Sequence, residues 1–226
     1  MVIYMIKQVY LLGSSDAMKP KIILEKIITL DLLNNYKIFI VTDSTNGHFY
    51  NFSIQNKLKI VLFDDIMKSN YEIEEKSILI SCGWPHMISN ELISKFSGKI
   101  INCHGSYLPD YRGSRAYMHY WANIEDFYGA TIHYVNSEFD DGNILAQYKI
   151  KLFPEESPEV IHYRTAELCA LLLPQAIQKV SLGDEGKAQE GLKRYFFKTS
   201  IENFKQIRDY NEHHQIKIMT KNKVIK

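Results

Sequence analysis

The sequence predicts an α/β fold in which a mostly parallel β-sheet is flanked by helices. Short apolar runs alternate with helical segments through the first half of the 226-residue chain. The runs are apolar at nearly every position, as strands are when helices cover both faces of a parallel sheet. Ligands bind such sheets beyond the carboxyl ends of the strands, so functional residues are expected just after each strand.

Strands and helices can be assigned in order through the first half. Gly13–Asp16 is expected to form a turn and a helix N-cap, because it follows an apolar run and precedes isoleucines with helical spacing. A later helix is expected to start near Ser89. The expected strands are residues 8–12, 36–43, 58–63, 77–83 and 99–105, and the expected helices lie within 18–34, 46–56 and 85–96.

The second half has a different pattern. Residues 129–136 and 144–153 alternate apolar and polar side chains, as antiparallel strands do. The polar residues between them are expected to form a loop. Helices are expected at 115–124 and 158–181, the second with a kink at Pro174.

A polar stretch at residues 181–191 is expected to be a flexible linker. We therefore divide the chain into a main domain, residues 1–182, and a small C-terminal extension, residues 183–226. The extension holds the aromatic run Tyr195–Phe197, for which ordinary core packing is the first interpretation. Cover over a bound ligand and a contact in a homodimer are the alternatives.

The composition excludes several classes of protein. Lys and Arg number 27 against 26 Asp and Glu, and this balance argues against a nucleic-acid partner. The chain has no apolar stretch of about 18 residues, and Lys7 interrupts the apolar N-terminus, so neither a membrane span nor a signal peptide is expected. Three scattered cysteines without a CxxC pair indicate a reducing compartment, and we expect a cytoplasmic protein.

One region gathers polar residues suited to catalysis. Asn102 and His104 are two residues apart at the end of a predicted strand, so their side chains share one face. Asp140 and Asp141 follow in a later loop. An amide and an imidazole can stabilise a developing oxyanion, while a carboxylate can raise the histidine pKa and carry a proton. Together they are suited to acyl-group transfer.

Other interpretations of these residues remain open. A histidine in a strand is often structural, and an aspartate in a loop often forms a turn or caps a helix. His104, His133 and an aspartate can also be combined into a metal site, although their spacing matches no zinc signature.

Three segments together resemble the signature of the folate-dependent formyltransferases. The family pattern is Asn-x-His-x-Ser-x-Leu-Pro, then Gly-x-Thr-x-His, then Asp-x-Gly. It matches residues 102–113 and 129–147, and the upstream residues 81–89 also fit. The matching positions are Asn102, His104, Ser106, Leu108, Pro109, Gly129, Thr131, His133, Asp140 and Gly142. The resemblance implies a Rossmann-like formyltransferase fold.

The resemblance also implies the roles of several residues. Asn102, His104 and Asp140 correspond to the catalytic trio, in which Asp140 keeps His104 cationic. The donor is implied to be 10-formyl-tetrahydrofolate, with no metal. Its pterin is expected in an apolar pocket that uses backbone groups of two segments, although Pro85 lacks one N–H. The expected donor-binding residues are Trp84, His86, Met87, Ile88, Val135 and Asn136.

Three branches of the family differ in the amine that accepts the formyl group. Methionyl-tRNA formyltransferases carry a tRNA-binding C-terminal domain larger than the segment after the predicted long helix. Glycinamide ribonucleotide formyltransferases bind phosphate at a Gly-x-Gly-Ser-Asn loop. Here Gly13–Asp16 lacks the second glycine and adds a carboxylate, which disfavours a phosphate.

The sugar N-formyltransferases are therefore the expected branch. Their acceptor is a nucleotide-linked amino deoxysugar used for surface polysaccharides such as the O-antigen of lipopolysaccharide. Ser106, Tyr111 and Arg112 are the expected substrate-binding residues, with Arg112 facing a diphosphate. A packed loop in which Arg112 forms a salt bridge is the alternative. A homodimer is expected. Glycinamide ribonucleotide formyl transfer, and a non-catalytic module that binds folate or a nucleotide, remain the alternatives.

Overall fold

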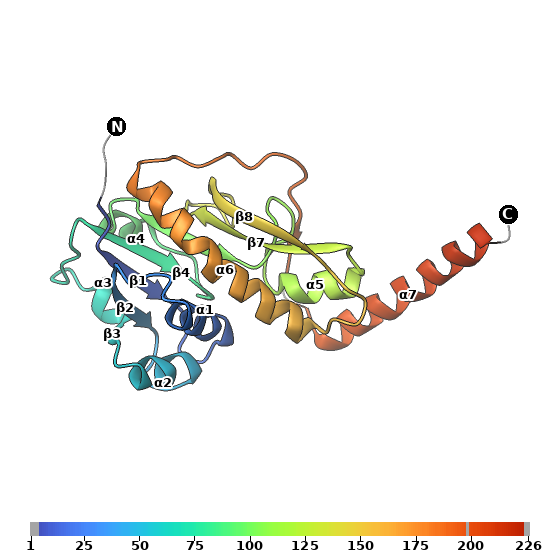
Figure 1. The fold of residues 1–226 in the computed structure, drawn as a ribbon, viewed down its shortest axis with the longest axis horizontal. Coiled ribbons are helices and arrows are strands. Elements are labelled where there is room, and N and C mark those ends of the chain that lie inside the picture. Colours follow the sequence, from blue (N-terminus) through green and yellow to red (C-terminus); the bar gives the residue numbers. More distant parts are fainter. Residues whose placement is uncertain (1–4, 198, 224–226) are drawn as a thin grey trace.

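A computed structural model describes residues 5–197 and 199–223, and its main feature is a seven-stranded sheet (Figure 1). The strand order is β3-β2-β1-β4-β5-β7-β8. The first five of these strands are parallel to their neighbours, whereas β7 and β8 are added antiparallel. The strands are β1 Gln8–Leu12, β2 Lys37–Thr42, β3 Lys59–Leu62, β4 Ser77–Ser81, β5 Ile100–His104, β7 Phe127–Tyr134 and β8 Ile144–Lys151. The predicted α/β class is confirmed.

Helices cover both faces of the sheet. The helices of the main domain are α1 Met18–Thr29, α2 His48–Gln55, α3 Phe63–Met67, α4 Asn90–Lys95, α5 Ala116–Asn123 and α6 Pro158–Ser181. Strand β1 is apolar throughout because it is buried on both faces. Val9 and Leu11 pack into the core beneath α1 and α6, while Tyr10 and Leu12 pack into the opposite core with Leu92 of α4. Such two-sided burial is typical of parallel sheets.

The turn after β1 differs from its predicted form. The N-cap residue of α1 is Ala17, which has no side chain able to accept a hydrogen bond, so the predicted N-cap is wrong. Instead, Asp43 at the end of β2 accepts hydrogen bonds from the Ser15 N–H at 2.8 Å and the Ser14 hydroxyl at 3.0 Å. The polar residues of the turn are thus held by the neighbouring strand. By contrast, Ser89 caps α4 as expected.

The C-terminal extension lies against the main domain at several points. The connection after α6 passes along β8, where Lys187 pairs with Ile144 (Figure 1). Strand β9, Tyr195–Phe196, then pairs with β6, Arg112–Gly113. Helix α7, Ile201–Lys223, packs on α5 through the fully buried Phe204 and projects from the end of the molecule (Figure 1).

Two further features of the described residues concern helices and cysteines. Helix α6 continues without interruption through Pro174. None of the helices in the described ranges combines the length and hydropathy needed to cross a bilayer. Cys82, Cys103 and Cys169 are buried and form no disulfide.

Candidate active site

Side chains from β5 and from the β7–β8 loop meet at one end of the sheet. Asn102 and His104 project from the same face of β5, as their two-residue spacing requires. Asp140 reaches them from the loop. One carboxylate oxygen, Asp140 Oδ1, lies 3.4 Å from His104 Nδ1 and accepts a hydrogen bond from Asn102 Nδ2 at 3.3 Å. Asn102 and His104 therefore both contact one carboxylate oxygen of Asp140, as expected of residues that act together.

His133 completes this cluster from β7. It stands opposite Asn102 in the strand register. Its Nδ1 lies 2.7 Å from its neighbour's carbonyl, that of Tyr134, so Nδ1 carries the proton. Its Nε2 lies 3.2 Å from Asn102 Nδ2 and 3.6 Å from Asp140 Oδ1. His133 thus helps to orient the amide of Asn102.

The Asp-x-Gly sequence is required by the tight path of the loop. Asp140 has a φ of +49°, a left-handed conformation that Asp and Asn tolerate better than most residues. Its second oxygen, Oδ2, accepts the Gly113 N–H at 2.8 Å. A Cβ on Gly142 would lie 1.8 Å from the Tyr134 carbonyl oxygen, so only glycine fits there.

Gly142→Ala is therefore expected to destabilise the protein by about 1–3 kcal/mol, because the backbone of the loop or of β7 must move to admit a methyl group. At about 2–4 °C per kcal/mol, thermal melting should show a loss of several degrees. Gly105→Ala is the matched control, since its Cβ would meet its first neighbour at an ordinary 3.4 Å. Equal melting temperatures for the two variants would contradict this account.

Burial sets the charge state of His104. It lowers the pKa of His104 below the usual 6.5, and nearby Lys19 and His133 lower it further. The carboxylate of Asp140 and the Tyr111 carbonyl oppose this shift without reversing it. The expectation that Asp140 holds His104 cationic is therefore wrong for the free protein, because desolvation of the ring outweighs the attraction.

Asp140 has the opposite balance. Burial raises its pKa, but His104, His133 and the Gly113 N–H outweigh burial and hold the pKa well below its usual value. The site at neutral pH therefore contains a carboxylate beside a neutral imidazole. Both ring nitrogens of His104 face acceptors, since Nε2 lies 2.9 Å from the Tyr111 carbonyl oxygen. Only an imidazolium can donate to both, so the site is prepared to stabilise His104 once it takes up a proton.

A largely apolar cavity of about 490 Å³ opens beside this cluster. All six residues that the sequence assigns to donor binding line it, together with Asn102, His104 and Asp140. The Trp84 ring packs on Phe63 with centroids 4.6 Å apart. Trp84 Nε1 is buried and has no hydrogen-bond partner among the described residues.

A second cavity of about 770 Å³ also has His104 in its wall. Its walls carry the cations Lys19 and Arg115, which the sequence analysis did not single out. His162 also lines it, and burial lowers its pKa to about 4, so this ring is neutral. The Lys19 ammonium donates to the Cys103 carbonyl oxygen at 2.5 Å, between Asn102 and His104. The residues that line both cavities are Lys19, Gly83, Pro85, His104 and Gly113.

Comparison with known proteins assigns the family. Residues 48–177, more than half of the chain, match the family model described as Formyl transferase. The chain belongs to the formyl transferase family. A phosphoribosylglycinamide formyltransferase from Haemophilus influenzae is 32% identical over 115 residues, a match that covers 51% of this chain and 54% of the relative. The match therefore spans about half the length of that relative.

Solved formyltransferase structures have the same fold. An N-formyltransferase from Helicobacter canadensis, in complex with folinic acid and dTDP-3-aminofucose, gives a TM-score of 0.67 at 19% identity, covering 85% of this chain and 71% of that one. A sugar 3N-formyl transferase, WlaRD, in the presence of dTDP and 5-N-formyl-THF, gives 0.66 at 22% identity, covering 86% and 70%. The predicted Rossmann-like formyltransferase fold is confirmed.

In this formyl transferase family member, the residues predicted to bind the acceptor lie in the interior. The Ser106 hydroxyl donates to the Asp110 carbonyl at 2.9 Å, and the Tyr111 hydroxyl contacts Glu125. Arg112 is 1% exposed, and its guanidinium is held by Asp141, Gln189 and Tyr195. None of the three predicted side chains lines either cavity, because the loop after β5 folds inward. The prediction that these three side chains contact the acceptor is therefore wrong.

The aromatic run of the extension divides between two environments. Phe196 stacks on Tyr111 with centroids 4.4 Å apart, in agreement with core packing. Tyr195 and Phe197 are 45% and 81% exposed. All three side chains of the run contribute to the wall of the apolar cavity. In the described part of the chain, no group of three or more His, Cys, Asp or Glu residues is arranged to hold a metal ion.

Proposed function

We propose that this protein transfers a formyl group from 10-formyl-tetrahydrofolate to the amine of a nucleotide-linked amino deoxysugar. One observation carries the proposal: the cluster of Asn102, His104 and Asp140 lies where an apolar cavity and a cationic cavity meet. A donor and an acceptor that enter from opposite sides would place formyl carbon and amine beside His104.

The apolar cavity suits the folate donor. Trp84, Ile88 and Val135 offer apolar and aromatic surface to a flat pterin. Structural neighbours are described with folinic acid or 5-N-formyl-THF bound. Pro85 has no backbone N–H, but the proposed formyl transfer does not involve a hydrogen bond at that position.

The proposed reaction moves one formyl group and one proton. The neutral amine attacks the formyl carbon, and negative charge develops on the formyl oxygen, towards which the Asn102 N–H that does not face Asp140 can donate. His104, neutral beforehand, takes up the amine proton, and the carboxylate of Asp140 stabilises the resulting imidazolium. The C–N bond to folate then breaks, and the proton passes to the departing folate nitrogen. The products are an N-formyl amine and tetrahydrofolate.

The cationic cavity supports an acceptor that carries phosphate. Lys19 and Arg115 can form charge-assisted hydrogen bonds with a diphosphate. Asp16 places a carboxylate in the turn after β1, which disfavours a phosphate at that turn. A sugar nucleotide, with its phosphates away from the turn, agrees with both features. As the family resemblance implies, we propose that the product serves surface polysaccharide synthesis.

Glycinamide ribonucleotide is the second candidate acceptor. It is favoured by the 32% identity to the Haemophilus influenzae phosphoribosylglycinamide formyltransferase. The deciding experiment incubates the protein and 10-formyl-tetrahydrofolate with dTDP-, UDP- or GDP-linked amino sugars or with glycinamide ribonucleotide, and measures tetrahydrofolate release. Turnover with the ribonucleotide alone would reject the sugar proposal. Donor binding without turnover on any amine would favour the non-catalytic alternative.

Arg115→Gln is expected to raise the KM for the acceptor by about 10-fold to 100-fold, because a hydrogen bond to a charged group contributes about 1.5–3 kcal/mol. The KM for the folate donor should stay unchanged, since Arg115 lines only the cationic cavity. Lys179→Gln, on α6 and outside both cavities, is the control for loss of one positive charge. An unchanged acceptor KM in Arg115→Gln would remove the diphosphate from this cavity.

Cytoplasmic location and a homodimeric state stay predictions. Sedimentation of the purified protein would test the second of these.

A further inference from the structure

Gln189, in the C-terminal extension, contacts the backbone on both sides of Asp141. Its amide nitrogen donates to the Asp140 carbonyl oxygen at 2.8 Å and to the Gly142 carbonyl oxygen at 2.9 Å. A single side chain, 49 residues beyond Asp140 in sequence, therefore spans the loop that carries the carboxylate.

Arg112 fixes the direction of this amide. Its NH2 group donates to Gln189 Oε1 at 2.5 Å, while NH1 donates to the Tyr195 hydroxyl at 2.8 Å. Arg112 also pairs with Asp141 at 2.5 Å and is almost fully buried. Because the guanidinium has only donors, the amide oxygen of Gln189 must face Arg112 and its NH2 group must face the two carbonyls.

The contacts of Asp140 with His104 and Asn102 tolerate only a small displacement of the loop. One carboxylate oxygen serves both His104 and Asn102 at 3.3–3.4 Å, and the residue has a left-handed φ of +49°. A loop that relaxes by a few tenths of an ångström would break these contacts. The amide of Gln189 holds the two backbone carbonyls on either side of Asp141.

We infer that Gln189 is a positioning residue for Asp140, so that the C-terminal extension sets the geometry of the reacting cluster. The inference rests on the proposed function for the meaning of that geometry. It assigns Arg112 to orientation of Gln189 rather than to the acceptor. It also gives the polar segment after α6 a role in catalysis through Asp140.

Two variants separate positioning from simple attachment. Gln189→Met keeps the length of the side chain and removes its donor and acceptor groups. Gln189→Glu keeps an acceptor for Arg112 but cannot donate to the carbonyls as a carboxylate. Both are expected to lower kcat by about 10-fold to 100-fold, the effect of a misplacement near 1 Å, with little change in either KM. If Gln189 only attached the extension, Gln189→Glu would retain wild-type kcat.

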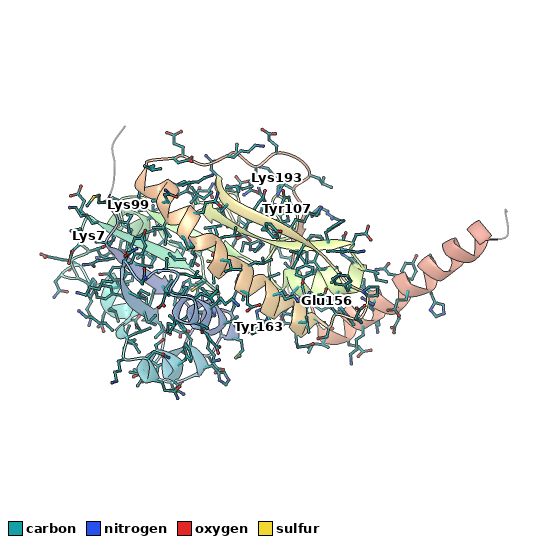
Figure 2. All side chains as sticks on the ribbon, viewed as in Figure 1. Lys7, Lys99, Tyr107, Glu156, Tyr163 and Lys193 are labelled. Carbon is teal, nitrogen blue, oxygen red and sulfur yellow. The ribbon has the colours of Figure 1, made fainter. Side chains whose placement is uncertain are left out.

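Lys193→Ala is the matched control. Lys193 lies in the same C-terminal extension (Figure 2), and its ammonium contacts the side chain of Asp141 at 2.9 Å rather than the loop backbone. This variant should retain wild-type kcat. Melting temperatures of all variants would show whether a loss of rate reflects unfolding.

The pKa of His104, measured by NMR titration, gives a readout independent of turnover. The groups that face His104 are Asp140, which raises the pKa, and Lys19 and His133, which lower it. If Asp140 moves away in Gln189→Met, the pKa of His104 should fall, whereas Lys193→Ala should leave it unchanged. An unchanged pKa in Gln189→Met, with wild-type kcat in Gln189→Glu, would overturn the inference. If the wild type formylated no amine, the proposed function would fail, while the titration would still decide whether Gln189 positions Asp140.

Discussion

His104→Ala is expected to lower the rate of formyl transfer by about 10²-fold to 10⁴-fold, the usual contribution of a positioned acid–base group. His104 lines both cavities and has an acceptor at each ring nitrogen. His133 is held differently: its Nδ1 lies against the Tyr134 carbonyl, and its Nε2 lies 3.2 Å from Asn102 Nδ2 and 3.6 Å from Asp140 Oδ1. The loss should appear in kcat, since proton uptake belongs to the transition state rather than to binding.

Donor binding separates lost chemistry from lost structure in this variant. Trp84 lies in the wall of the apolar cavity, and Trp121 is the second of the two tryptophans. In a Trp121→Phe background, quenching of Trp84 fluorescence by the folate donor should therefore report binding directly. His104→Ala should bind the donor about as well as the background protein. His48→Ala, an exposed histidine outside both cavities, should retain full turnover. A His104→Ala protein with near-normal turnover would reject the proposed role.

The central fold could be predicted because its physical causes are local. Each residue of β1 is buried, so the whole strand is apolar and is recognisable without its neighbours. Ser89 and the proline at the start of α6 likewise mark helix starts by their own side chains. The turn after β1 was missed in part because its stabilising carboxylate, Asp43, comes from another strand.

The reacting cluster was predictable for a different reason. The alternation of side chains along β5 places Asn102 and His104 on one face, and the glycine at 142 marks a loop that turns sharply. The charge of His104 was not predictable, because it depends on how completely other segments exclude water from the ring. The sequence motif predicts that Asp140 lies near His104, but it does not show how strongly burial lowers the pKa of His104.

The contacts that the C-terminal extension makes with the main domain could not be predicted from the sequence. The polar composition of residues 181–191 is typical of a flexible linker, yet Lys187 pairs with β8 and Gln189 binds the Asp140 loop. For Arg112 the sequence left two interpretations open, contact with a diphosphate and a salt bridge in a packed loop, and the structure shows the second. Its actual partners, Asp141 and Gln189, are distant in sequence.

Asp140→Asn is expected to lower turnover by about 10²-fold to 10⁴-fold while the loop keeps its shape. Asparagine tolerates the left-handed φ of +49° and can still accept the Gly113 N–H. What is lost is the negative charge that stabilises protonated His104. Asp141→Asn is the comparison variant, because Asp141 pairs with Arg112 and Lys193 rather than with His104. Its loss should be far smaller, and equal losses would contradict the assignment of Asp140.

The pH dependence of Asp140→Asn tests the direction of the coupling. His104 acts from its neutral form, so wild-type kcat/KM should fall as the pH drops through the His104 pKa, which lies below 6.5. Asp140 raises that pKa against burial, and its removal must lower the pKa further. The acid limb of the Asp140→Asn profile should therefore move to lower pH than in the wild type. A limb that moved to higher pH would mean that Asp140 does not stabilise the imidazolium, and the proposed proton transfer would fail with it.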